Sequence, residues 1–142
     1  MNLAELSAFA ASLNHLDREE IQKAKLLFLK NEIIKHKASY KTRSLNLLFL
    51  VIMGTIFLFL AFRDLNRNLV NPGLLLLFTL LGLFIIYIFF SSSKVDLITE
   101  KQQISNALEI WKGDLGNNYF ELKTKLENAK SNIPIISIFF NN

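Results

Sequence analysis

The sequence has no cysteine, and it has only two histidines in 142 residues. Without cysteine the chain cannot form a disulfide, a thiolate metal site or a cysteine nucleophile. His15 and His36 are far apart, and neither has a second histidine or a suitably spaced carboxylate with which to hold a metal ion. The sequence also lacks a glycine-rich phosphate loop, a serine nucleophile elbow and a convincing pair of catalytic acids. We therefore expect no enzymatic activity, no metal ion and no cofactor.

Charge is absent from two long stretches, Leu45 to Phe62 and Leu74 to Phe90, and residues 69–73 extend the second one. A helix rises about 1.5 Å per residue, so each stretch reaches most of the way across a hydrocarbon core of about 30 Å. Neither stretch has the polar stripe of a surface helix in a soluble domain. A chain of 142 residues is too small to bury both in a soluble core. The sequence therefore predicts two transmembrane helices, near residues 45–62 and 72–90.

The polar segment 63–71 between these stretches indicates how the two helices are connected. Asn71 and Pro72 form the pattern of a helix start, with asparagine as the N-cap and proline at the first helical position. So short a connection forces the two spans into an antiparallel pair. We expect a tight turn at residues 63–71, with the second span beginning near Pro72.

Lysine and arginine are concentrated before the first span, at Lys23, Lys25, Lys30, Lys35, Lys37, Lys41 and Arg43. Fewer follow the second span, and the turn has only Arg63 and Arg67. Basic residues favour the cytoplasmic side, so we expect both termini inside and the turn outside. The expected location is a bacterial inner membrane, with an organellar membrane as the alternative.

Four basic residues lie close to the start of the first span: Lys35, Lys37, Lys41 and Arg43. The net charge of +4 and this position suit contact with anionic lipid headgroups. No nucleic-acid motif is present, so nucleic acid is not an expected partner. His36 lies among these residues, and we interpret it as part of the same basic cluster.

Residues 1–44 are predicted to form an amphipathic, basic helical arm. Asn2 with Glu5, and Asp17 with Glu20, have the spacing of helix-capping boxes. No glycine or proline follows until Gly54, so a single helix is expected from residue 18 into the first span. We expect this arm to pack against the C-terminal region of the same chain or against a neighbour; the alternative is a coiled coil that sets the oligomeric state.

Residues 91–142 are predicted to form further cytoplasmic helices. Ser93 and Asp96 have the spacing of an N-cap and its N3 partner. An apolar stripe at helical spacing follows, which we interpret as a core face or a partner face: Leu97, Ile104, Leu108, Trp111 and Leu115. Gly113 and Gly116 are expected to end this helix.

The remaining C-terminal residues are predicted to form a short helix over 119–130, which Pro134 closes. The tail from Ile133 to Phe140 is apolar and has no period. It fits a strand added to a partner, a segment in the membrane interface, or a plug over the helices. A free tail of this composition would aggregate, so we expect it to be covered.

Small residues in the two spans offer positions for close helix packing: Gly54, Ala61, Thr79 and Gly82. In lipid, helices associate through small residues that let their backbones approach. We interpret these residues as closing the two spans on each other. The alternative is that one small-residue face contacts another chain.

The predicted fold is therefore an all-α membrane protein, a two-span transmembrane helical hairpin with amphipathic cytoplasmic helices on both sides. Neither span contains aspartate, glutamate, lysine, arginine or histidine, and ion-coupled transport normally needs such residues at depth. We expect a non-enzymatic anchoring or accessory subunit of a membrane complex. Its partners would be membrane lipids and other membrane-protein chains, the same or different.

The alternative function is a homo-oligomeric, membrane-perturbing pore of a holin-like kind. In layout, two spans with flanking cytoplasmic helices resemble two-span bacterial defence effectors, although no specific motif is shared. A water-filled pore needs a polar face along a span, and Asn46, Thr55, Thr79 and Tyr87 do not form one.

Overall fold

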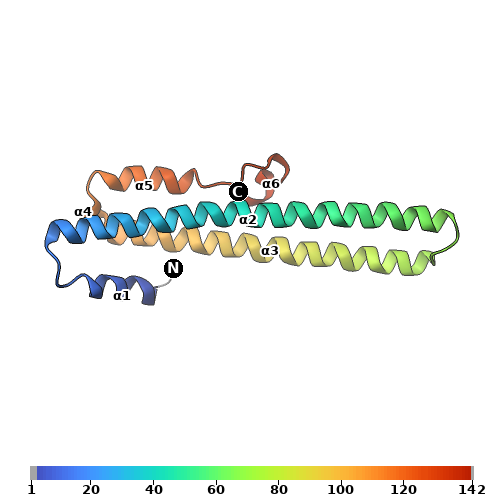
Figure 1. The fold of residues 1–142 in the computed structure, drawn as a ribbon, viewed down its shortest axis with the longest axis horizontal. Coiled ribbons are helices and arrows are strands. Elements are labelled where there is room, and N and C mark those ends of the chain that lie inside the picture. Colours follow the sequence, from blue (N-terminus) through green and yellow to red (C-terminus); the bar gives the residue numbers. More distant parts are fainter. Residues whose placement is uncertain (1–2, 142) are drawn as a thin grey trace.

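The computed structural model describes residues 3–141, and this part of the chain contains helices and no strand. The helices are α1 (Leu3–Ser12), α2 (Arg18–Asn66), α3 (Pro72–Ile110), α4 (Lys112–Leu115), α5 (Asn118–Glu127) and α6 (Pro134–Phe140). Helices α2 and α3 are long and apolar enough to cross a membrane. They lie side by side and run in opposite directions, and α1 and α5 lie on opposite sides of this pair (Figure 1).

Helix α2 is a single helix of 49 residues, as expected from the lack of breakers after residue 18. Asp17 precedes it with an extended backbone, and Glu19 and Glu20 place negative charge in the first turn, where the helix dipole favours it. The Asp17 side chain makes no capping hydrogen bond. Asn2, of the other predicted capping box, lies outside the described residues. At about 1.5 Å per residue, α2 extends over roughly 70 Å.

Helix α3 begins as predicted, because Asn71 accepts a hydrogen bond from the Gly73 amide at 2.8 Å and Pro72 stands in the first turn. It then continues without a break to Ile110, so the predicted new helix start at Ser93 is wrong. A serine caps a helix only where backbone N–H groups lack partners. Here the preceding turn of helix supplies those partners, and the Ser93 side chain is buried instead.

The turn between the long helices is shorter than the predicted segment 63–71. Helix α2 continues through Arg63 to Asn66, since no glycine or proline interrupts it there. Asn68 has a φ of +58°, a left-handed conformation that asparagine tolerates better than most residues. The Leu69 amide then donates to the Asp64 carbonyl at 2.9 Å, which closes the turn.

The C-terminal part folds back along the long helices. Helix α3 ends at Ile110, the short α4 follows after Trp111, and Gly116, with a φ of +57°, turns the chain into α5. Pro134 begins α6 rather than closing the preceding helix, because proline at the first helical position already has a helical φ. The tail is therefore helical and not a strand, despite its β-branched residues.

Two clusters of buried side chains hold these elements together. The distal core lies at the end of the long pair far from the turn, and it joins α1, α2, α3, α4 and α5 through Leu6, Leu29, Ile33, Ile104, Ala107, Leu108, Trp111, Leu115, Tyr119, Leu122 and Leu126. The boundary core joins α2, α3 and α6 through Tyr40, Leu47, Leu97, Ile136 and Phe140. Between the boundary core and the turn, no other element of residues 3–141 lies beside α2 and α3, so the two helices pack against each other there (Figure 1).

Candidate functional site

The boundary core lies where the apolar stretch of α2 begins and where that of α3 ends. Phe90, near the end of the second apolar stretch, stacks on Phe140 of α6 with ring centroids 5.4 Å apart, and it meets Phe139 edge-on at 5.5 Å. Leu48 and Ile86 also pack against this core. Helix α6 is thereby held against the long helices at the level where charged sequence gives way to apolar sequence.

A small hydrogen-bonded network fixes the segment that leads into α6. The Ser44 hydroxyl donates to the Ser131 hydroxyl at 2.7 Å, and both side chains are buried. The Asn141 side chain accepts from the Ser131 amide at 2.9 Å and donates to the Ser131 carbonyl at 3.1 Å. Asn141, directly after α6, is therefore bonded to Ser131 in the segment that precedes α6, and Ser44 bonds the same segment to α2. Buried polar groups that are paired in this way cost little and fix one arrangement.

His36 lies inside the helix pair, with 0% of its side chain exposed. Its Nδ1 is 3.4 Å from the Glu100 carboxylate of α3, and its ring meets Tyr40 edge-on at a centroid distance of 5.0 Å. Neither ring nitrogen has a hydrogen-bond partner in the described part of the chain. Burial lowers the pKa of His36 below 6.5, while the charge of Glu100 opposes that shift. Burial raises the pKa of Tyr40, and the negative charge of Glu100 raises it by a smaller amount.

The interpretation of His36 as a member of the surface basic cluster is therefore wrong. It belongs to the buried stripe of α2, which recurs at helical spacing: Leu29, Ile33, His36, Tyr40, Ser44 and Leu47. That spacing is visible in the sequence. The lysines on both sides of His36, however, make this position resemble part of a charged surface.

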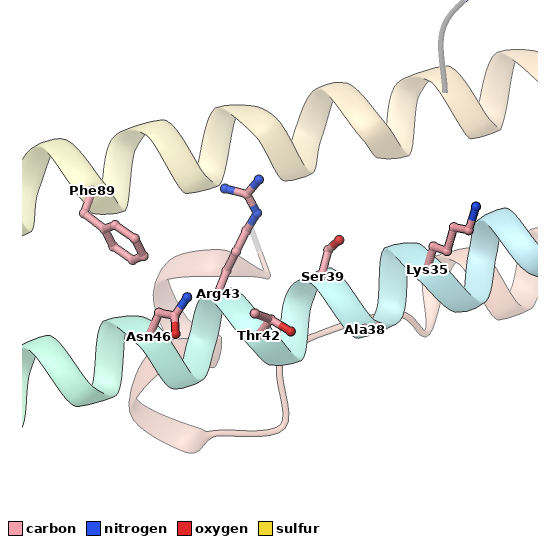
Figure 2. A pocket seen from close by; sticks show the side chains of 7 residues that line it. All are labelled: Lys35, Ala38, Ser39, Thr42, Arg43, Asn46 and Phe89. Carbon is pink, nitrogen blue, oxygen red and sulfur yellow. The ribbon is translucent and has the colours of Figure 1, made fainter. Parts of the chain in front are cut away.

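The predicted basic cluster is divided between two faces of α2. Lys35 and Arg43 line a cavity of about 520 Å³ that is formed by side chains of α2 together with Phe89 of α3 (Figure 2). Arg43 pairs with Asp96 at 3.2 Å, and Lys35 approaches Glu32 at 3.7 Å. Lys37 and Lys41 line a different groove, beside the segment that leads into α6. Residues two apart on a helix point in nearly opposite directions, because each residue turns the chain by about 100°.

The predicted apolar stripe is buried within this chain. Leu97 lies in the boundary core, and Ile104, Leu108, Trp111 and Leu115 lie in the distal core. Trp111 meets Phe9 at 6.0 Å and Phe28 at 5.9 Å, both from the N-terminal arm. The Lys25 ammonium lies 5.2 Å from the centre of the Trp111 ring and pairs with Asp114 at 2.6 Å. The stripe thus packs against the chain's own N-terminal arm.

The small residues of the two apolar stretches do not share one face. A Cβ added to Gly54 would lie 3.8 Å from Ile86 Cδ1, so Gly54 faces α3. A Cβ added to Gly82 would meet nothing within 4 Å, so Gly82 faces outward. Ala61 and Thr79 are half-buried. The Thr79 hydroxyl donates to the Leu75 carbonyl of its own helix at 2.8 Å.

Among residues 3–141, no group of three or more histidine, aspartate or glutamate side chains is arranged to hold a metal ion. Comparison with protein-family models, with curated proteins and with solved structures found no match to this chain.

Proposed function

We propose that this protein is an integral membrane protein whose two long helices form a transmembrane hairpin, and that it anchors partner proteins at the membrane surface. In this proposal residues 45–62 and 72–90 span the bilayer. The helical arm 1–44 and the C-terminal helices 91–142 stand on the cytoplasmic side, and the turn lies outside. The chain acts as a non-enzymatic subunit and contributes helix packing rather than chemistry.

The exposure of apolar side chains on α2 and α3 is the observation that supports this proposal. Of the most apolar 18 residues, only 11% are buried in α2 and only 6% in α3. Large side chains such as Phe59, Leu76 and Phe84 are more than half exposed. A soluble monomer rarely exposes so continuous an apolar surface, and a helix in lipid needs one.

Polar groups within the apolar stretches favour anchoring over conduction. The Thr55 hydroxyl donates to the Val51 carbonyl at 2.9 Å, and Thr79 bonds to its own helix in the same way. These hydroxyls already have their acceptors, and no ionisable residue lies near them in the sequence. The pair therefore has little with which to replace the hydration shell of an ion.

Beyond the boundary core the two long helices continue as a stalk. From Arg18 to Ser44, α2 extends about 40 Å, and the distal core joins it to α1, α4 and α5. The exposed side chains of α5 are mostly charged or polar, and they include Phe120. Ile110, the last residue of α3, is exposed at the same end. We propose that this end of the stalk contacts the partner.

The alternative is a pore built from several copies of this chain. The outward position of Gly82 suits it, since a glycine on the lipid side lets another helix approach closely. Purification in mild detergent, followed by native mass measurement and a liposome dye-release assay, separates the two functions. We expect bound partner subunits of another sequence and no dye release. A ladder of identical chains that releases dye at modest density would overturn the anchoring function.

A further inference from the structure

We infer that the groove between α2 and the segment leading into α6 binds the phosphate headgroup of an anionic phospholipid from the membrane leaflet that surrounds it. This inference rests on the proposed insertion of α2 and α3 into a membrane. It goes further because it assigns one side of the helix pair, and three particular lysines, to the lipid.

The groove has a volume of about 480 Å³ and combines basic and apolar walls. Lys37 and Lys41 of α2 line it, and Lys130 lines it from the other side. Leu45 and Ile133 supply apolar surface in the same groove. The hydrogen bond between Ser44 and Ser131 joins its two walls, so the groove is fixed by packing that is already present in the protein.

The three lysines have no acidic partner. In the described part of the chain, no carboxylate lies within 4.0 Å of the ammonium group of Lys37, Lys41 or Lys130. On the opposite face of α2, by contrast, Arg43 pairs with Asp96 and Lys35 approaches Glu32. Three unpaired ammonium groups around one groove favour an anion with several oxygen acceptors, and a phosphate is such an anion.

The position of the groove favours a lipid over a free phosphate. Lys41 is one helical turn from Leu45, the first residue of the apolar stretch, so the lysines lie where lipid headgroups meet the hydrocarbon region. Helix α6 follows directly after Ile133 of the groove wall, and its Ile135 and Phe139 are exposed and apolar. A phospholipid can therefore place its phosphate among the lysines and its acyl chains against Leu45 and α6. A free phosphate would leave the apolar walls without a function.

The test compares two variants with the same charge. The groove variant is Lys37→Gln, Lys41→Gln and Lys130→Gln, and the control variant is Lys23→Gln, Lys94→Gln and Lys123→Gln, whose residues lie outside the groove. Native mass spectrometry in detergent measures binding of phosphatidylglycerol, of phosphatidylcholine and of inorganic phosphate. Far-UV circular dichroism checks that both variants remain helical.

We expect the unaltered protein to prefer phosphatidylglycerol to phosphatidylcholine. The groove variant should bind phosphatidylglycerol about 100-fold more weakly, since each lysine near an anionic surface contributes roughly fivefold. The control variant should bind as the unaltered protein does. An equal loss in both variants, equal binding of phosphatidylcholine, or displacement of the lipid by inorganic phosphate would overturn the inference.

A separate measurement distinguishes failure of this site from failure of the proposed function. Alkaline carbonate extraction shows whether the chain is integral to membranes. If it remains with the membrane while both variants bind lipid alike, the groove assignment alone is wrong. If carbonate releases it, the proposed membrane function is wrong as well.

Discussion

At the scale of single residues, His36 links the stability of the helix pair to pH. Burial lowers the pKa of His36 in the folded protein below its ordinary value of 6.5. The unfolded chain therefore binds more protons than the folded chain as the pH falls through that value. Stability rises with pH wherever the unfolded state binds more protons, so it must fall on acidification through about pH 6.5.

We expect His36→Gln to reduce this pH dependence. Between about pH 7.5 and pH 5.5 the free energy of unfolding should decrease less in the variant than in the unaltered protein, because glutamine does not titrate. Glu100→Gln is the matched variant with the opposite effect: it removes the carboxylate that favours the charged imidazole, so the decrease should become steeper. Denaturant unfolding in detergent, followed by circular dichroism, measures both. Three identical pH profiles would show that His36 does not link stability to pH.

Trp111 is the second residue with a measurable effect, because it joins the N-terminal arm to the end of α3. Its side chain is 4% exposed, and Trp111→Ala should lower the free energy of unfolding by roughly 3–5 kcal/mol, as for other large-to-small core changes. Phe120→Ala is the control, since Phe120 is 68% exposed and its loss should cost about 0.5 kcal/mol or less. Trp111 is the only tryptophan, so its fluorescence in the unaltered protein should be that of a buried indole. Equal losses in the two variants would show that Trp111 is not packed in a core.

Single residues differ in how well the sequence predicts their positions. Trp111 and Leu108 could be assigned to a buried face, because their neighbours at three and four residues are also apolar. His36 could not be assigned by composition, since a histidine between two lysines is more typical of a surface. It is buried between α2 and α3, next to Glu100, which is 64 positions away in the sequence and is brought near only by the antiparallel pairing of the helices.

At the scale of elements, the two glycines of the apolar stretches should respond differently to a large side chain. Gly54→Leu should weaken the pairing of α2 with α3, because the new side chain extends toward Ile86, which already lies 3.8 Å from the position of a Cβ. Gly82→Leu should leave the pair intact, since nothing lies within 4 Å of that position. The free energy of unfolding in detergent measures how far each substitution weakens the helix pair. The mass of the oligomer shows whether Gly82→Leu changes the association between chains. Comparable destabilisation by both substitutions would contradict this arrangement.

Helix α6 offers a second test, made simple by the absence of native cysteine. Single cysteines at Ile135 and Phe139, labelled with nitroxide in reconstituted vesicles, should be relaxed mainly by oxygen dissolved in the lipid. A label at Lys123 of α5, which is also exposed, should be relaxed mainly by a water-soluble reagent. These expectations follow from the apolar side chains that α6 exposes beside the first apolar stretch. Preferential relaxation of the α6 labels by the water-soluble reagent would place α6 outside the lipid.

The sequence predicts elements well where breakers are absent, and less well where short motifs suggest a boundary. The uninterrupted α2 follows from the lack of glycine and proline, and Asn71 with Pro72 correctly marks the start of α3. Ser93 with Asp96 has the spacing of a cap, but the preceding turn already satisfies the backbone. Pro134 is compatible with either the end of one helix or the start of the next. In the structure Pro134 starts α6, and Ile136 and Phe140 of that helix are buried against α2 and α3.

At the scale of the whole molecule, the basic residues predict an orientation for the proposed transmembrane hairpin. A reporter enzyme that is active only outside the cytoplasm should be active when inserted after Arg67 and silent at either terminus. We expect the termini inside and the turn outside because the lysines beside the first apolar stretch outnumber the two arginines at the turn. A cytoplasmic reporter at the same three positions is the control and should give the opposite pattern. Activity of the external reporter at the termini would reverse the orientation.

In the proposed membrane arrangement, the continuity of α2 and α3 also sets the height of the distal core above the bilayer. Because neither helix is interrupted at Ser44 or Ser93, the distance from the bilayer to the distal core would be fixed by the length of helix between them. A thicker bilayer draws more of the helix pair into the hydrocarbon, or reduces its tilt, and so changes how far Trp111 and the surrounding helices stand from the headgroups. Bilayer thickness thus becomes a displacement of the partner-facing end, and membranes of different composition would hold an attached protein at different heights.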